Sequence, residues 1–267
     1  MPSALRDPTG AFSPCRWSTD VTEPLTPEET RRYARHIVLK GVGGEGQQKL
    51  KAARVGVIGA GGLGSPVIAY LAAAGVGTLV IVDDDAVSLS NLQRQIVHRS
   101  DDIGRAKAES AEAFVAALNA HVEVLPVVAR LDGGNAASLL AGCDVIVEGT
   151  DRFDSRLVAA EAGEALRVPV VSGAVSMFDG QVTVFAPHRQ DASGRAYPRF
   201  RDLYPDDPEE GDLPSCEVVG VLGAVTGVIG TLMAMEAIKL ITGLGEPLLG
   251  RLLLYDGRAA RFTELAY

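Results

Sequence analysis

A glycine-rich turn, Gly59-Ala60-Gly61-Gly62-Leu63-Gly64, separates an apolar run at 54–59 from an alanine-rich stretch at 65–74. This order predicts a β-strand that turns tightly into an α-helix, with backbone N–H groups at the helix N-terminus facing an approaching anion. Further apolar runs alternate with helical stretches along the chain, as is typical of a parallel sheet. We therefore expect an α/β fold: a Rossmann-like mixed, mostly parallel sheet flanked by helices.

The other predicted elements follow from the same alternation. Strands are expected at 78–83, 122–129, 143–150 and 168–173, with helices at 105–119, 135–140 and 154–166. An alternating strand at 180–187, a glycine-rich apolar helix region at 218–243 and a strand at 250–256 complete the pattern. These last elements predict an antiparallel C-terminal extension of the sheet.

The domain organisation is read from composition along the chain. Residues 1–24 contain Pro and Ser but no apolar core of a secretion signal, so we expect a flexible N-terminal extension. The remainder, 25–267, is expected to form a single domain whose nucleotide-binding half covers about 50–175. A polar stretch at about 188–215 is too long for an idle connection and predicts a crossover loop before a C-terminal helix and strand region at 216–267.

Composition limits the classes of partner. The formal net charge is −9, which argues against a nucleic-acid-binding surface. The three cysteines, Cys15, Cys143 and Cys216, form no CxxC pair, which argues against a disulfide framework and favours a reducing, cytoplasmic setting. A charge-free run at 218–235 reaches the lower length limit of a membrane span, but four glycines interrupt it. A buried or subunit-facing helix pair is expected there, and no membrane.

The glycine turn and Asp83 together predict an adenine nucleotide. Asp83 ends the second strand, where a carboxylate can accept hydrogen bonds from ribose hydroxyls. These features do not distinguish NAD from ATP. The segment 83–107 does, because it adds Asn91, Arg94, Gln95 and Lys107 near the carboxyl edge of the sheet. Such donors suit a triphosphate, although each alone could equally belong to a solvated loop.

Two more charged residues are candidates for the reaction. Asp151 ends the strand at 143–150, where a carboxylate could hold Mg²⁺ between phosphates. Its alternative interpretation is a helix N-cap, a role that Asp154 or Ser155 could fill equally well. Arg35 lies on an amphipathic N-terminal helix, and an exposed arginine on a helix is usually only solvated.

Residues 25–256 resemble the E1-like ThiF/MoeB/HesA family. The resemblance rests on a chain of motifs in order: RRYARHIVL, GAGGLGSPVIAYLAAAGVGTLVIVDDDAVSLSNLQRQIVH, GRAK, GTDRFDSR, VPVVSGAVSMFDGQVTVF and GVLGAVTGVIGTLMAMEAIKL. It implies an adenylyltransferase that uses ATP and Mg²⁺ to adenylylate the C-terminal Gly-Gly of a ubiquitin-like sulfur carrier such as ThiS or MoaD. It also implies a homodimer in which an arginine of one protomer, the arginine finger, reaches the site of its partner.

Carried over by position, the resemblance assigns roles within the motifs. By this resemblance, Arg35 matches the arginine finger, Arg94 and Lys107 bind the phosphates, and Asp151 binds Mg²⁺. Cys216 matches a position where several relatives place a cysteine for thioester or sulfur transfer, and it is equally consistent with an unreactive loop cysteine. The implied nucleotide-binding residues are Gly59, Gly61, Gly62, Asp83, Asp85, Ser90, Asn91, Leu92, Gln93, Arg94, Gln95, Lys107, Asp151 and Arg152.

The chain also departs from the family pattern. Arg199-Phe200-Arg201-Asp202 stands where many members carry the first CxxC of a zinc site, so no structural zinc is expected. Arg152 replaces an asparagine after the metal-binding aspartate. The activated carboxylate could instead belong to a modified tRNA nucleoside, a peptide or a small acid, and an NAD-binding oxidoreductase or a non-catalytic scaffold are the more distant alternatives. The sequence names neither the carrier nor the sulfur donor or pathway.

Overall fold

The computed structural model describes residues 24–207 and 220–267. Eight strands form one sheet in the order β3-β2-β1-β4-β5-β6-β7-β8. The first five strands in this order are parallel, and β5 to β8 pair as antiparallel neighbours. The predicted mixed, mostly parallel sheet with an antiparallel C-terminal extension is therefore confirmed.

The strands are short and mostly buried because each is an apolar run bounded by turns. Within β1, four of the five residues are buried, and all four residues of β4 are buried. The bounds are β1 Arg54–Ile58, β2 Thr78–Val82, β3 Glu123–Val127, β4 Val145–Glu148, β5 Val170–Ser176, β6 Asp179–Phe185, β7 Arg251–Asp256 and β8 Arg261–Ala266.

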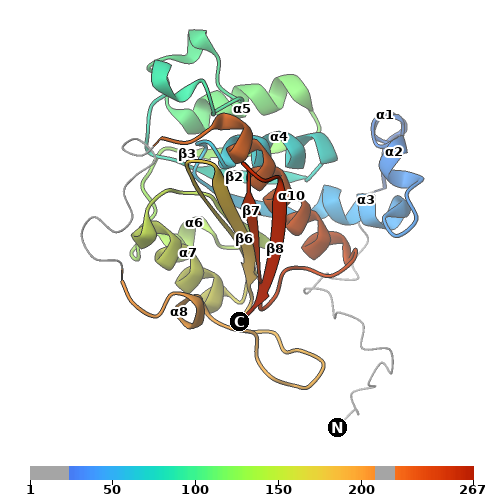
Figure 1. The fold of residues 1–267 in the computed structure, drawn as a ribbon. Helices are drawn as coiled ribbons and strands as arrows, with labels where there is room; N and C mark the ends of the chain where they lie inside the picture. The colour runs from blue at the N-terminus through green and yellow to red at the C-terminus, as the bar shows by residue number, and fades with distance from the viewer. Residues whose placement is uncertain (1–23, 208–219) are drawn as a thin grey trace.

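Helices cover both faces of the sheet (Figure 1). One core forms where α4, α5 and α10 pack on the sheet, and a second forms around α6, α7 and α8. The bounds are α1 Pro27–Arg32, α2 Ala34–Ile37, α3 Gly43–Ala52, α4 Gly64–Ala74, α5 Lys107–Leu118, α6 Ala136–Leu139, α7 Phe153–Leu166, α8 Phe200–Leu203 and α10 Gly223–Thr242, with short 3₁₀ turns η1 Leu89–Asn91 and η2 Ser100–Asp102.

Several predicted elements differ in detail. The strand expected at 143–150 is shorter, because its last residues form the turn that leads into α7. The described part of the polar stretch contains α8 and an isolated bridge between Gln190 and Ala196. The edge strand β8 was not predicted, since its six residues are exposed and alternate weakly. Residues 1–23 of the expected N-terminal extension, and Cys216, lie outside the described residues.

Helix α10 contains residues 223–235 of the charge-free run and is a core element. Its length and composition would allow it to cross a membrane, but 56% of its most apolar window is buried inside the protein. The buried Glu236 near its end accepts a hydrogen bond from Leu248 N–H at 2.9 Å and pairs with Lys239. A satisfied carboxylate at this depth fits a helix that packs inside a folded domain.

Gly230 lets α10 approach α4 closely. A Cβ added at Gly230 would lie 2.3 Å from Pro66 Cγ and 2.5 Å from the Leu63 carbonyl oxygen. Gly227, one turn earlier on α10, has no atom within 4 Å of such a Cβ. Gly230 is therefore required for the packing of α10 on α4, whereas Gly227 has only the ordinary energetic cost of glycine in a helix.

We predict opposite effects of alanine at these two positions. Gly230→Ala should destabilise the fold by about 1–3 kcal/mol because the methyl group overpacks the α4 contact. Gly227→Ala should be neutral or stabilise by up to about 1 kcal/mol because alanine favours the helix. Urea denaturation of both variants measures the difference. Equal stabilities would contradict the packing of α10 on α4.

Candidate nucleotide site

A pocket of about 320 Å³ lies at the carboxyl ends of β1, β2 and β4. In such sheets, ligands bind where the strand order changes direction, here between β1 and β4. The predicted residues that line it are Gly59, Gly61, Gly62, Asp83, Asp85, Asn91, Arg94, Gln95, Lys107, Asp151 and Arg152. Segments far apart in the sequence are thus brought together as the motifs predict.

The glycine turn adopts a shape that other residues resist. Gly59 has a left-handed φ of +89°, and a Cβ at Gly64 would lie 1.8 Å from the Gly59 carbonyl oxygen. Gly59, Gly61 and Gly62 border the pocket. Among the described residues, no acceptor is hydrogen-bonded to the backbone N–H of Gly61 or Gly62, so both groups are available to an anion.

Asp83 accepts a hydrogen bond at each carboxylate oxygen, one from this turn and one from the segment after β2. Oδ2 accepts from Ala60 N–H at 2.7 Å, and Oδ1 accepts from Asp85 N–H at 2.9 Å. Burial raises the pKa of Asp83, while the nearby Lys107 and these two N–H groups favour the charged form. Each oxygen keeps a further lone pair, so the carboxylate can still accept from a ribose hydroxyl.

Lys107 begins α5 and is paired with Asp85. Its Nζ lies 2.7 Å from Asp85 Oδ2, and the two side chains are 7% and 67% exposed. The ammonium group is thus held inside the protein while the carboxylate faces solvent. An anion that enters the pocket would meet a lysine whose position is already fixed.

The predicted donors of segment 91–95 lie around η1 and the turn after it. Arg94 Nη1 donates to the Ser90 carbonyl at 3.2 Å, which keeps the guanidinium beside the glycine turn. Gln95 is only 3% exposed, and its Oε1 has no hydrogen-bond partner in the described parts of the chain. A buried amide oxygen without a partner indicates that a ligand or solvent donor completes the site.

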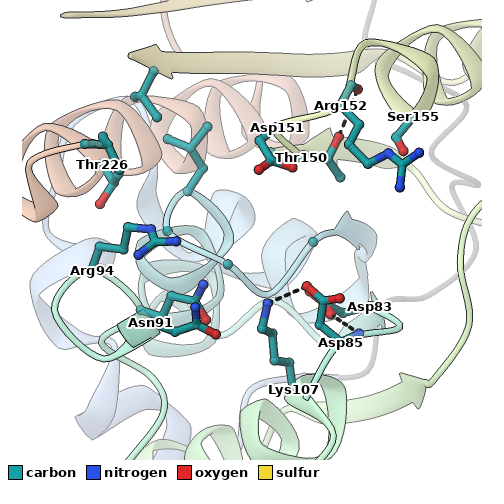
Figure 2. A pocket seen from close by; sticks show the side chains of 18 of the residues that line it. Asp83, Asp85, Asn91, Arg94, Lys107, Thr150, Asp151, Arg152, Ser155 and Thr226 are labelled. Carbon is teal, nitrogen blue, oxygen red and sulfur yellow. Dashed lines mark hydrogen bonds and ion pairs between the residues drawn. The ribbon is translucent and has the colours of Figure 1, made fainter. Parts of the chain in front are cut away.

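Asp151 lies across the pocket from these donors. Figure 2 shows it on the opposite side from Arg94, Asn91 and Lys107 in this view. Within the described ranges, no hydrogen bond or ion pair involves its exposed carboxylate. An unengaged carboxylate that faces a pocket lined by cationic and amide donors fits Mg²⁺, which prefers few protein oxygens and several phosphate or water ligands.

The turn that carries Asp151 is held from below by Glu148. This fully buried carboxylate accepts from Thr150 N–H and Thr150 Oγ1, both at 2.7 Å, and from Ser172 Oγ at 3.0 Å. Arg156 donates twice to the Thr150 carbonyl, at 3.0 and 3.2 Å. Glu148, Arg156 and Ser172 therefore fix the backbone that presents Asp151, although burial raises the pKa of Glu148.

Asp151 does not cap a helix, so that alternative interpretation is wrong. Arg152 is the N-cap of α7 and makes no capping hydrogen bond with its side chain. Asp154 and Ser155 do not supply the cap either, because both lie inside the first turn of α7.

A second group of carboxylates lies after β2. In the acidic trio Asp83, Asp84 and Asp85, one oxygen of each side chain lies within 4.8 Å of the others. Two of these three carboxylates already hold backbone N–H groups or Lys107.

Other predicted residues lie away from the pocket. Ser90, Leu92 and Gln93 share the segment with Asn91 but do not line the cavity. Arg35 is exposed on α2 and does not line it either. His188 follows β6 beyond Phe185, which pairs with Val170 at the opposite edge of the sheet from the pocket. Burial lowers the pKa of His188 to about 4.

The sequence prediction missed several lining residues. Thr226 and Val221 come from the start of α10 and the segment before it, far along the chain. A Cβ at Gly62 would lie 3.1 Å from Thr226 Cγ2, so α10 closes one side of the glycine turn. Ser88 and Arg156 lie within the motifs quoted above, but nothing in the sequence marked either one as a pocket residue. Only the folded arrangement brings α10 to this position.

A larger groove of about 930 Å³ adjoins the pocket. It runs over β5, β6 and β7 and is bordered by Phe200, Leu203 and Tyr204 of α8 and its end. Phe200 is buried against Phe185 and Tyr204, so aromatic packing anchors the segment 199–202, where no zinc ligands were expected. The pocket and the groove share Asp151, Arg156 and Val175.

Comparison with known proteins gives a consistent result. The ThiF family profile matches residues 33–267. The SAMP-activating enzyme E1 of Haloferax volcanii is 47% identical over 92% of this chain and 88% of its own length. The sulfur carrier protein adenylyltransferase of Thermus thermophilus is 45% identical over 90% of this chain and 88% of its own length.

A longer relative and a solved structure extend the comparison. The probable adenylyltransferase/sulfurtransferase MoeZ of Mycobacterium tuberculosis is 48% identical, and the match covers 87% of this chain but 58% of MoeZ. The crystal structure of PaaA superposes with a TM-score of 0.74 at 23% identity, covering 98% of this chain and 77% of that one. At that identity the likeness concerns the fold alone.

The buried Glu148 predicts a pH-dependent contribution to stability. Because its pKa is raised above 4.5 in the fold, its contribution is complete at lower pH and is lost as pH rises through the raised value. Glu148→Gln removes this titration. The free energy of unfolding of the variant minus that of the wild type should therefore increase from pH 4.5 to pH 8. A difference that stays constant or falls would contradict the assignment.

Proposed function

The chain belongs to the ThiF family, and we propose that it uses ATP to adenylylate the C-terminal glycine carboxylate of a ubiquitin-like sulfur-carrier protein. The predicted enzyme class, an adenylyltransferase that serves sulfur transfer, is confirmed by its relatives. The acyl-adenylate that forms is open to attack by a sulfur nucleophile. Sulfur transfer is the use that we propose for it.

One observation carries this proposal: the nucleotide pocket and the groove adjoin and share the lining residues Asp151, Arg156 and Val175. A reaction between ATP and a protein tail needs two adjoining cavities, one for the triphosphate and one for an extended chain. The groove crosses the antiparallel strands and ends beside the metal-binding candidate. We propose that the carrier tail lies in this groove with its carboxylate at the junction.

The chemistry explains why the site holds cations and no general base. A C-terminal carboxylate has a pKa of about 3.5 and is already ionised near neutral pH. The barrier is repulsion between the carboxylate and the triphosphate. Catalysis then consists of holding the carboxylate in line with departing pyrophosphate and neutralising charge.

The residues around the pocket have distinct proposed roles. The N–H groups of Gly61 and Gly62 bind phosphate oxygens, Asp83 binds the ribose, and Arg94 and Lys107 neutralise phosphate charge. Asp151 would hold Mg²⁺, which would polarise the phosphate oxygens when bound. Lys107 would exchange part of its contact with Asp85 for the triphosphate. The exposed Arg152 adds a further cation at the same edge.

We also propose a homodimer in a cytoplasmic setting, in which Arg35 of each protomer reaches the other site. Arg35 is exposed on α2 and lies beside the exposed apolar residues Val38 and Leu39, at 75% and 52% exposure. An interface that covers these side chains would bury apolar surface. Cys216 remains a proposed acceptor in the later sulfur-transfer step, and zinc has no part in the proposal.

Loss of Asp151 should abolish activity without unfolding the protein. Asp151→Ala should lower carrier-dependent ATP–pyrophosphate exchange by at least about 100-fold because the metal site is removed. Asp154→Ala is the matched control, since Asp154 is exposed three residues later and lines neither cavity. Cys216→Ala should keep adenylylation. Exchange at the wild-type rate in Asp151→Ala would refute the metal assignment.

The arginine finger can be tested by complementation. Arg35→Ala and Asp151→Ala should each be inactive, because each removes one part of every site. Coexpression of the two variants forms mixed dimers in which one site has both residues, so about a quarter of wild-type exchange should return under random pairing. A mixture as inactive as each variant alone would show that Arg35 does not act across an interface.

A further inference from the structure

His98 lies beneath the glycine turn and does not line the nucleotide pocket. The side chain is 6% exposed and makes two hydrogen bonds of 2.8 Å. Its Nε2 contacts the Ala60 carbonyl oxygen in the glycine turn, and its Nδ1 contacts Ser110 Oγ on α5. The predicted site included neither His98 nor Ser110.

These contacts define which ring nitrogen carries the proton. A carbonyl oxygen can only accept, so Nε2 must carry the hydrogen that is donated to Ala60. Burial lowers the pKa of His98, which favours the neutral ring. In the neutral ring, Nδ1 then carries no hydrogen, and it lies 2.8 Å from Ser110 Oγ, which also hydrogen-bonds the Asp102 side chain. The contact with the Ala60 carbonyl therefore requires the tautomer in which Nε2 donates to the glycine turn.

The Ala60 carbonyl belongs to the same peptide unit as the N–H of Gly61. In a planar trans peptide the C=O and N–H point in opposite directions. A carbonyl drawn toward the buried His98 turns the Gly61 N–H away from His98. Gly61 lines the pocket and His98 does not, so an N–H that points away from His98 is compatible with one that faces the pocket.

We propose that His98 is a positioning residue that holds the Gly61 N–H toward the triphosphate of ATP. Asp83 fixes the N–H of Ala60 at 2.7 Å, and His98 fixes its carbonyl, so both peptide units around Ala60 are oriented before ATP arrives. This inference rests on the proposed function only in requiring ATP as the ligand.

The same ring couples the turn to the lysine helix. Ser110 lies one turn after Lys107 on α5, and His98 itself follows the segment that carries Asn91 and Arg94. His98 therefore connects the glycine turn, α5 and the segment 91–95, which are separate in the sequence and meet at the phosphate site. Preorganisation of this kind lowers the ordering cost of binding.

Two substitutions separate the two hydrogen bonds. In His98→Gln the side-chain amide nitrogen can reach the place of Nε2 and donate to Ala60, whereas the shorter amide of His98→Asn reaches only the place of Nδ1. The full-length chain is titrated with a non-hydrolysable ATP analogue in a calorimeter. His98→Asn should bind about tenfold more weakly, a difference of about 1.4 kcal/mol, and His98→Gln within about twofold of the wild type.

Thermal unfolding and NMR spectroscopy distinguish positioning from general stability. Both variants should have similar melting temperatures, and the Gly61 amide resonance should shift on addition of the analogue in the wild type and in His98→Gln. Equal affinities in the two variants, or a wild-type Gly61 amide that does not respond to a bound analogue, would overturn the role of His98. A wild-type protein that binds no analogue would instead overturn the proposed function.

Discussion

The hydrogen bond from the Ala60 N–H to Asp83 Oδ2, at 2.7 Å, is the contact on which the nucleotide site depends. It joins the turn after β1 to the end of β2 and sets the direction of the backbone that faces the pocket. Gly64 allows the helix to start against the Gly59 carbonyl, and Asp83 keeps the turn in that shape. The parallel strands therefore supply a rigid edge, and the turn supplies the anion-binding groups.

Repulsion between the carboxylate and the triphosphate opposes the proposed reaction, and cationic side chains around the site offset this repulsion. The chain has a net charge of −9, yet Arg94, Arg152, Arg156 and Lys107 gather around one pocket. The acidic groups in the same place are each restrained: Asp85 pairs with Lys107, and Glu148 is buried under three donors. Of the residues that the structure describes at the junction with the groove, Asp151 alone presents a carboxylate without a hydrogen bond or ion pair, which suits a bound cation.

The sequence predicted the sheet, the glycine turn and most of the pocket because those signals are local. Apolar strands, the turn and the donors of segment 91–95 each occupy a short continuous stretch. Thr226 and Arg156 could not be placed in this way, since their positions depend on how α10 and α7 pack on the sheet. The N-cap alternative for Asp151 failed because the turn into α7 begins one residue later than the pattern suggests. The exposed β8 carries too little apolar alternation to be recognised.

The central claim is that the chain transfers AMP to the terminal carboxylate of a carrier protein. The most direct measurement is the intact mass of each small Gly-Gly-ending protein encoded by the same genome after incubation with this chain, ATP and Mg²⁺. The account predicts a carrier whose mass increases by one AMP unit, and no increase in a matched carrier that lacks its last glycine. If no candidate gains this mass while a small acid or peptide does, the proposed substrate is wrong.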